Sequence, residues 1–358
     1  MRRLVPLHLP GGPDFVDALQ RAWDDGDAVL PMDPRLSHSV VERLLASMRV
    51  DEPVEDGDAL VVATSGSTGD PKGVVLTHDA VRASAISTST RLSVDPTTDS
   101  WLACLPLAHV GGLSVVTRAL VTGTRLVVHD GFDAEAVQRA GTTLVSLVST
   151  ALRRIDPSPF RVVVLGGSAP PSEVPPNVVT TYGMTETGSG VVYDGVPLDG
   201  VEVRVDERGE IHLRGPMLLR AYRNGTDPKD AEGWLPTGDL GAFGDDGRLR
   251  VKGRASDLII SGGENVWPAA VEAVLAEDDD VAEVAVVGRF DAEWGQRVVA
   301  LVVPVDSDRP PPLDRLRARV REQIGPWAAP KDVELVDALP RTALGKIRRA
   351  QIETEHHT

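Results

Sequence analysis

The 358-residue sequence predicts a two-domain α/β protein, with a large N-terminal domain and a small α+β C-terminal domain. The length exceeds what one hydrophobic core usually supports, so two domains are expected. Between residues 59 and 181 short apolar runs alternate with helix-like segments, a pattern typical of mostly parallel sheets. After Tyr182 the pattern becomes one of short hairpins, which favours a small distorted barrel, and it changes again at Pro268.

The first part of the chain should supply the parallel strands. We expect buried strands at 59–64, 124–130, 142–148 and 161–167, and helices at 77–87 and 133–140. The strand segments are short apolar runs bounded by turn residues, as buried strands are. Cys104, the single cysteine, lies in the apolar run WLACLPL and is interpreted as a buried structural residue, so no disulfide within the chain is possible.

Two later parts complete the expected fold. Residues 201–215 and 241–254 alternate apolar and polar side chains around Gly-containing turns, which predicts antiparallel hairpins. A helix at 268–279, strands at 281–289 and 297–305 and a helix at 313–324 then form the α+β unit. The acidic run 277–280 is interpreted as a solvated helix end rather than a metal site. We place the domain boundary between residues 1–254 and 255–358.

The charge balance excludes some partners. Lys and Arg total 37 against 53 Asp and Glu, so the net charge is −16, and such a field repels nucleic acid and anionic membrane surfaces. We therefore expect no nucleic-acid or membrane partner. Pro6 and Pro10 interrupt the apolar start of the chain, which argues against a signal peptide and favours a cytoplasmic location. An anionic ligand must be held by local donors and a few cations.

The segment from Thr64 to Gly73, TSGSTGDPKG, is the strongest functional signal. Glycines let backbone N–H groups approach an anion, hydroxyls add donors, and Lys72 supplies a positive charge for a triphosphate. It is not a Walker A loop, because Gly73 rather than Ser or Thr follows Lys72. The alternative interpretation is a flexible surface linker. The composition favours a nucleotide phosphate loop.

This loop resembles that of the adenylate-forming superfamily, which comprises acyl-CoA synthetases, peptide-synthetase adenylation domains and luciferases. Four further stretches resemble motifs of the superfamily in the same order, and the matches extend from about residue 60 to residue 349. They are Tyr182–Thr187 (YGMTET), Trp234–Asp239 (WLPTGD), Gly253–Asp257 (GRASD) and Pro340–Arg349 (PRTALGKIRR). The resemblance implies ATP, Mg²⁺ and coenzyme A as ligands, and a carboxylic acid as substrate.

The resemblance also implies roles for individual residues. Tyr182 packs on adenine, Thr185 contacts phosphate, and Glu186 holds Mg²⁺. Asp239 accepts hydrogen bonds from both ribose hydroxyls, which suits a paired-oxygen acceptor. Gly166 and Gly167 follow an apolar strand, where a doubly wound sheet tends to bind ligands. The expected nucleotide-binding set is Thr64, Ser65, Gly66, Ser67, Thr68, Gly69, Lys72, Gly166, Gly167, Ser168, Tyr182, Gly183, Asp239 and Arg254.

The C-terminal domain is expected to move between two half-reactions. By resemblance, Lys346 brings an ammonium to the carboxylate and the α-phosphate during adenylation. The domain then turns about a hinge, and a loop containing Gly262 and Gly263 admits the thiol of coenzyme A. Ser256 occupies the hinge position where the superfamily commonly has Asp or Lys.

Two further stretches of sequence bear on the identity of the acid substrate. Pro106–Leu113 resembles an acyl-pocket entry, with His109 as the gating candidate or, alternatively, as a structural histidine. The run at 181–201 and the short N-terminal part most resemble compact actinobacterial 2-succinylbenzoate–CoA ligases of menaquinone biosynthesis. Such an acid carries a second carboxylate, for which Ser189 and Thr185 are candidates, and the sequence singles out no pocket arginine.

Several alternatives stay open. The acid could be another aromatic or fatty acid, and the acceptor could be the phosphopantetheine arm of a carrier protein, because the same motifs serve both. A non-catalytic nucleotide- or acyl-binding protein would be expected to lack Lys346 or Glu186, and both are present. A homodimer interface is a possible way to close the acyl pocket beside the short N-terminal part.

Overall fold

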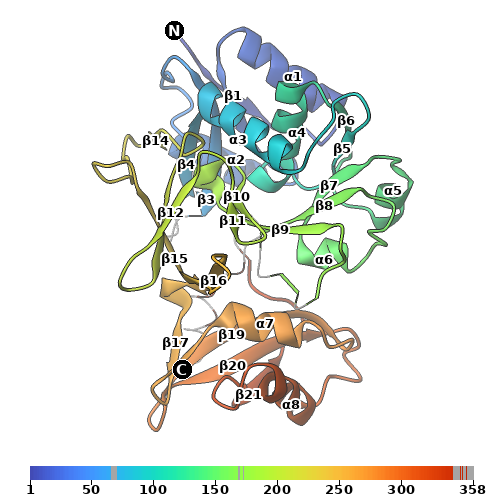
Figure 1. Cartoon of the computed structure of the whole chain (residues 1–358), viewed down its shortest axis with the longest axis vertical. Helices are drawn as coiled ribbons and strands as arrows, with labels where there is room; N and C mark the ends of the chain where they lie inside the picture. Colours follow the sequence, from blue (N-terminus) through green and yellow to red (C-terminus); the bar gives the residue numbers. More distant parts are fainter. Residues whose placement is uncertain are drawn as a thin grey trace.

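The computed structural model describes residues 1–65, 71–167, 170–171, 173–341, 347, 349 and 352. The chain forms a larger lobe and then a smaller one, drawn above and below each other in Figure 1. Three buried apolar clusters lie within residues 4–249 and two within residues 259–352, so each lobe has its own core. No helix in the described part of the chain combines the length and the apolar character needed to cross a bilayer.

The first sheet of the larger lobe carries the phosphate-loop segment. Its strand order is β1-β2-β3-β4-β14, and β1 to β3 run parallel. Strands β3 and β4 form an antiparallel hairpin in which Ala63 faces Gly73, so the phosphate loop connects two paired strands. The strand expected at 59–64 is confirmed as β3, and its pairing with β4 departs from the mostly parallel arrangement expected for this part of the chain. The bounds are β1 Leu4–Leu7, β2 Ala28–Pro31, β3 Asp58–Ser65, β4 Pro71–Thr77, β14 Ala221–Tyr222, α1 Pro13–Asp24 and α2 His38–Ser47.

The second sheet contains the predicted parallel strands. Its order is β11-β10-β9-β8-β7-β5-β6, parallel from β9 to β6 and antiparallel at β10 and β11. The strands expected at 124–130, 142–148 and 161–167 are confirmed as β6, β7 and β8. The bounds are β5 Ser100–Ala103, β6 Arg125–Val128, β7 Leu144–Leu147, β8 Val162–Leu165, β9 Val178–Gly183, β10 Gly190–Tyr193, β11 Val196–Pro197, α5 Ala134–Arg139 and α6 Ser149–Leu152.

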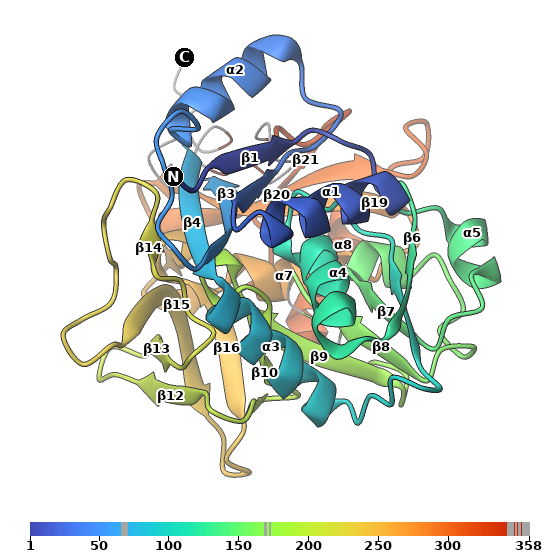
Figure 2. The same cartoon turned by 90° about the horizontal axis from the view of Figure 1, so that it is seen from above.

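Two helices fill the space between these sheets. Helix α3 (His78–Arg91) packs on β3 and β4, and α4 (Val110–Thr122) packs on β5, β6 and β7. The two helices also pack against each other, as Figure 2 shows. The Thr77 hydroxyl caps α3 by accepting a hydrogen bond from the Ala80 amide at 3.1 Å. This bond gives an acceptor to one of the amides that the start of a helix leaves unpaired. Because α3 packs on the β3–β4 hairpin and on α4, and α4 packs on the second sheet, the two helices connect the hairpin to that sheet.

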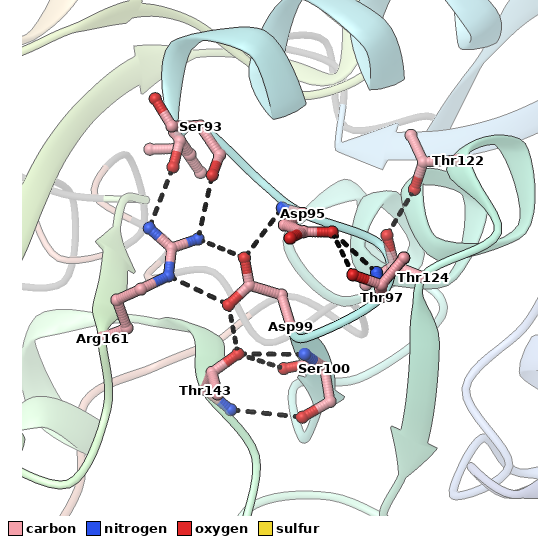
Figure 3. A network of polar contacts seen from close by, with 10 residues as sticks. Ser93, Asp95, Thr97, Asp99, Ser100, Thr122, Thr124, Thr143 and Arg161 are labelled. Carbon is pink, nitrogen blue, oxygen red and sulfur yellow. Dashed lines mark hydrogen bonds and ion pairs between the residues drawn. The ribbon is translucent and has the colours of Figure 1, made fainter.

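A polar network closes one end of the second sheet (Figure 3). Asp99 precedes β5, Thr143 precedes β7 and Arg161 precedes β8, so all three lie at the N-terminal ends of parallel strands. The buried Asp99 carboxylate accepts hydrogen bonds from Arg161 Nε at 2.9 Å and Thr143 Oγ1 at 2.8 Å. The opposite, carboxyl end of the sheet remains for a ligand.

The remaining elements follow the prediction closely. Strands β12 (Glu202–Val205), β13 (Glu210–Arg214), β15 (Leu235–Phe243) and β16 (Leu249–Arg254) form an antiparallel sheet in that order. This sheet corresponds to the expected small distorted barrel. The short helix η1 (Thr185–Thr187) connects β9 to β10.

The smaller lobe is the expected α+β unit, with one correction. Helix α7 ends at Leu275, so the acidic run 277–280 lies beyond it, and Asp278 is not solvated: it is 4% exposed and binds Arg315 at 2.8 Å. A buried carboxylate with an arginine partner avoids the cost of an unpaired charge. The bounds are η2 Ala255–Asp257, β17 Ile259–Ser261, β18 Glu264–Val266, α7 Pro268–Leu275, β19 Val281–Asp291, β20 Gly295–Pro304, α8 Leu313–Gln323 and β21 Asp332–Leu335.

Candidate active site

The carboxyl ends of β8 and β9 form one wall of the candidate site. Gly166 and Gly167 follow β8, and Gly183 ends β9. A Cβ at Gly166 would lie 2.7 Å from the Thr181 hydroxyl, and Gly167 has φ of +85°, a conformation that favours glycine. Both positions therefore need glycine for the backbone to turn away from β8 at this edge.

Tyr182, Asp239 and Arg254 meet although they come from three different strands. The Tyr182 hydroxyl donates to Asp239 Oδ2 at 2.8 Å, and Arg254 Nε lies 2.9 Å from Asp239 Oδ1. Asp239 and Arg254 are directly opposite each other in the β15–β16 pair. A second Arg254 nitrogen donates to the Thr237 carbonyl at 3.0 Å. Both carboxylate oxygens of Asp239 are therefore held by donors.

The electrostatics of this group suit a ribose. Burial raises the pKa of Asp239, although the Arg254 cation opposes that shift. Burial also raises the pKa of Tyr182, and the neighbouring Asp239 charge adds to it, so the phenol stays protonated and remains a donor. A carboxylate has about four lone-pair sites, so Asp239 can accept the two hydroxyls of a ribose in addition to Tyr182 and Arg254. The residues present therefore fit the sugar of a nucleotide.

Glu186 lies on η1, beside the hairpin that leads out of the phosphate loop. Its Oε1 accepts a hydrogen bond from the Tyr222 hydroxyl at 2.9 Å, and the Lys72 ammonium lies 5.1 Å from the centre of the Tyr222 ring. Thr185 is the adjacent residue of η1 and adds a hydroxyl. Mg²⁺ is usually bound by one or two carboxylates together with substrate phosphates and waters. The single Glu186 carboxylate next to a phosphate-binding lysine fits that pattern.

Tyr222 was not found by sequence reasoning. It lies in the run AYRNG, and nothing local marks it, because its place beside Glu186 depends on the long-range pairing of β14 with β4. Burial raises the pKa of Tyr222, and the Glu186 charge raises it further, so its hydroxyl remains a donor.

Arg118 on α4 is the second residue that sequence reasoning missed. Its side chain is 2% exposed, it donates to Ser189 Oγ at 3.0 Å, and its guanidinium lies 4.7 Å from the Trp101 ring centre. Among the described residues its Nε and Nη1 have no hydrogen-bond acceptor, and burial lowers its pKa. A buried cation without an anionic partner is costly. A single arginine inside the apolar run GGLSVVTRALVTG was the signal available in the sequence.

The other two acyl-pocket candidates are His109, directly before α4, and Ser189, directly before β10. His109 is the half-buried residue that precedes α4, and Ser189 is buried next to Gly190, where β10 begins. A small apolar cavity between α3 and α4 is lined by Val110, Leu113 and Gly188 among others. The structure thus brings Ser189 and Arg118 together, and it places His109 at the other end of α4.

The hinge and coenzyme A candidates belong to the smaller lobe. Ser256 lies in η2, and its hydroxyl donates to Asp257 Oδ1 at 2.9 Å. Gly262 and Gly263 form the β17–β18 turn with φ of +60° and +85°. A Cβ at Gly262 would lie 2.6 Å from the Trp294 ring, so this turn packs on the neighbouring hairpin. In Figure 1 the β17 strand runs down the smaller lobe, away from the larger one.

Some predicted residues lie outside the described part of the chain. They are Gly66, Ser67, Thr68, Gly69, Ser168 and Lys346, together with the side chain of Ser65. Thr64 is described, and its backbone pairs with Lys72 across the β3–β4 hairpin. The two ends of the phosphate-loop segment are thus fixed beside each other.

Two family models match this chain. The model for the AMP-binding enzyme matches residues 13–223, and the model for the AMP-binding enzyme C-terminal domain matches residues 270–346. The first match contains Tyr182, Glu186 and Tyr222, and the second contains Lys346.

Curated relatives and solved structures are similar over nearly the whole chain. A Mycobacterium tuberculosis protein named probable 2-succinylbenzoate–CoA ligase is 40% identical over 97% of both chains. The 2-succinylbenzoate–CoA ligase of Bacillus licheniformis is 37% identical over 83% of this chain and 70% of its own. The o-succinylbenzoate CoA synthetase of Bacillus subtilis in complex with its acyl-adenylate intermediate has a TM-score of 0.86 at 28% identity, covering 99% of this chain and 89% of that one. The same enzyme with ATP and magnesium has a TM-score of 0.83.

Proposed function

The chain belongs to the AMP-binding enzyme family, and from that membership we propose that it is an ATP-dependent 2-succinylbenzoate–CoA ligase that acts through an acyl-adenylate. The carboxylate of the acid attacks the α-phosphate of ATP and pyrophosphate leaves. The thiol of coenzyme A then attacks the acyl carbon and displaces AMP. Mg²⁺ neutralises charge on the phosphates while it is bound.

The residues of the larger lobe bind and orient the nucleotide in this proposal. Asp239 accepts the ribose hydroxyls, and Arg254 keeps its carboxylate ionised and directed. Lys72, over the Tyr222 ring, holds the triphosphate, and Glu186, which accepts from the Tyr222 hydroxyl, holds Mg²⁺. Lys346 supplies a further cation at the α-phosphate. Such prearranged charges lower the barrier because they need no reorganisation during the reaction.

Arg118 is the observation that supports an acid with a second carboxylate. The guanidinium is buried and hydrogen-bonded to Ser189, a residue four positions after Thr185 of η1, and it has no carboxylate partner in the described residues. A substrate carboxylate brought to Ser189 and Arg118 would supply the missing anion. A simple fatty acid would leave Arg118 unpaired.

Other parts of the proposal are supported less directly. The domain boundary between residues 254 and 255 agrees with the separate apolar cores on either side of it. A cytoplasmic location and a homodimer remain predictions from the sequence. A carrier-protein acceptor is the alternative to coenzyme A, and the names of the relatives favour coenzyme A.

The test is ATP–pyrophosphate exchange with a panel of acids. The panel contains 2-succinylbenzoate, benzoate, and short and medium fatty acids, and the best acid is then incubated with coenzyme A or with a phosphopantetheinylated carrier protein. We expect exchange with 2-succinylbenzoate and a coenzyme A thioester detected by mass. Exchange with another acid alone would contradict the substrate, and thioester only on the carrier protein would contradict the acceptor.

A further inference from the structure

Tyr222 connects the two groups that the proposed function assigns to the metal and the triphosphate. Its hydroxyl donates to Glu186 Oε1 at 2.9 Å, and its ring faces the Lys72 ammonium at 5.1 Å. The Tyr222 side chain therefore contacts both the Lys72 cation and the Glu186 carboxylate.

The backbone around Tyr222 is held firmly in place. Tyr222 faces Val74 in the β14–β4 pair, two residues after Lys72, and the Arg223 amide donates to the Gly73 carbonyl at 2.6 Å. On the other side, the Leu219 amide donates to the Glu186 carbonyl at 2.7 Å. One short segment thus fixes the position of both the phosphate-loop hairpin and η1.

Two arginines that flank Tyr222 anchor this segment to the rest of the lobe. Arg220 pairs with the buried Asp58 at 2.9 Å and with Glu55 at 2.7 Å. Arg223 donates to four backbone carbonyls that follow α2, at 2.6 to 3.1 Å. A side chain that orients a reacting group must itself be held in place, because its position is only as well defined as that of the residues that pack around it.

We propose that Tyr222 is a positioning residue that aims the Glu186 carboxylate at Mg²⁺ and keeps Lys72 beside it, so that metal and triphosphate bind as one unit. This inference rests on the proposed function for the identity of the ligand. With its hydroxyl bound to Oε1, the Glu186 carboxylate has one fixed orientation and retains its second oxygen for the metal. Fixing a metal-binding carboxylate by a hydrogen bond raises metal affinity.

The first test compares Tyr222→Phe with the wild-type chain in metal binding. Mn²⁺ is titrated in the presence of α,β-methylene-ATP and followed by electron paramagnetic resonance. We expect the Mn²⁺ Kd to rise about tenfold in Tyr222→Phe, since removing an aligned partner of a metal-binding carboxylate typically costs 10- to 100-fold in affinity. Tyr193→Phe is the matched control: it removes a hydroxyl that bonds Thr88 in the core and should leave the Kd unchanged. An unchanged Kd in Tyr222→Phe overturns the proposal.

The second test asks whether the hydroxyl acts through Glu186. The Mn²⁺ Kd is measured for Glu186→Gln, Tyr222→Phe and the double variant. We expect the double variant to bind no more weakly than Glu186→Gln alone, because the hydroxyl has no carboxylate left to orient. Additive losses would show a separate, general structural role and would also overturn the proposal.

The third test separates the ring from the hydroxyl. Tyr222→Leu removes both, and we expect it to raise the KM for ATP about two- to fivefold beyond Tyr222→Phe, the size of a cation–π contact at an exposed lysine. Equal ATP KM values in the two variants would contradict the role of the ring. If none of the acids in the panel supported pyrophosphate exchange by the wild-type chain, the proposed function would fail. The Mn²⁺ titration would still decide the role of Tyr222.

Discussion

Arg118 is the single residue at which stability and function should separate most clearly. Its guanidinium is buried without a carboxylate partner, so Arg118→Met removes a costly charge and keeps most of the side-chain volume. We expect the free energy of unfolding of the ligand-free chain to stay within about 1 kcal/mol or to rise. The KM for 2-succinylbenzoate should rise about 100-fold, because the acid loses its buried charge partner.

Urea unfolding without ligand and pyrophosphate exchange with 2-succinylbenzoate measure the two effects of Arg118→Met. Ser189→Ala is the matched variant, since it removes the hydroxyl that Arg118 contacts and leaves the charge. It should raise the KM for the acid by much less. A destabilised Arg118→Met variant with an unchanged KM would show that the arginine only supports the core.

The pH dependence of ATP use should report the Asp239–Arg254 pair. Burial raises the pKa of Asp239 and Arg254 lowers it, so Arg254→Gln should raise that pKa further. A carboxyl with a higher pKa takes up its proton at a higher pH, and the protonated form is a poorer ribose acceptor. The acidic limb of kcat/KM for ATP should therefore move to higher pH in Arg254→Gln.

The matched control for Arg254→Gln is Arg250→Gln on the same strand. Arg250 pairs with Asp246 on the surface, away from Asp239, and its loss should leave the acidic limb in place. A general fall of kcat/KM in Arg254→Gln is also expected if the arginine touches the nucleotide. An acidic limb that stays at the wild-type pH in Arg254→Gln would nevertheless contradict the electrostatic coupling between Arg254 and Asp239.

At the scale of elements, the network around Asp99 joins the N-terminal ends of three parallel strands (Figure 3). Asp99→Ala leaves Arg161 and Thr143 without their carboxylate acceptor, although both keep bonds to backbone carbonyls. Loss of one member of a buried pair costs about 3–5 kcal/mol, and since the Arg161 side chain is 40% exposed we expect about 2 kcal/mol here. The KM values should not change, because the network lies at the end of the sheet opposite the site.

The cost of Asp99→Ala should also depend on pH. Burial alone would raise the pKa of Asp99, but its hydrogen bonds, first those from Arg161, lower it overall. The stabilisation is thus present above the unfolded carboxyl pKa and is lost as the pH falls through the folded value. Urea unfolding at neutral and acidic pH measures this. Asp245→Ala, at an exposed position between β15 and β16 where the structure gives the carboxylate no hydrogen bond among the described residues, should cost less than about 0.5 kcal/mol at either pH.

Across the whole molecule, local patterns predicted the elements and missed contacts between distant segments. Strands β6, β7 and β8 of the second sheet and the helix after the phosphate loop could be predicted, because their apolar patterns are local. The β3–β4 hairpin and the strands before residue 59 were missed, since strand pairing is set by partners far along the chain. Tyr222 was missed for the same reason, whereas Arg118 had a local signal, a single arginine in an apolar run. Motif residues such as Tyr182 and Asp239, which the structure brings together, were proposed because short contiguous motifs resemble those of the superfamily.

The proposed movement of the smaller lobe gives the last prediction. Lys346 lies three residues before Arg349, which binds Glu272 of α7 at 2.6 Å and lies 3.4 Å from Asp257 of η2. The C-terminal segment is thereby attached to the junction between the lobes. Lys346→Ala should abolish pyrophosphate exchange, because no cation then reaches the α-phosphate, and it should spare thioester formation from supplied acyl-adenylate. Ser256→Pro, which stiffens η2 at the junction, should spare exchange and slow thioester formation. Equal losses in both assays for both variants would mean that a single arrangement of the lobes serves the two half-reactions.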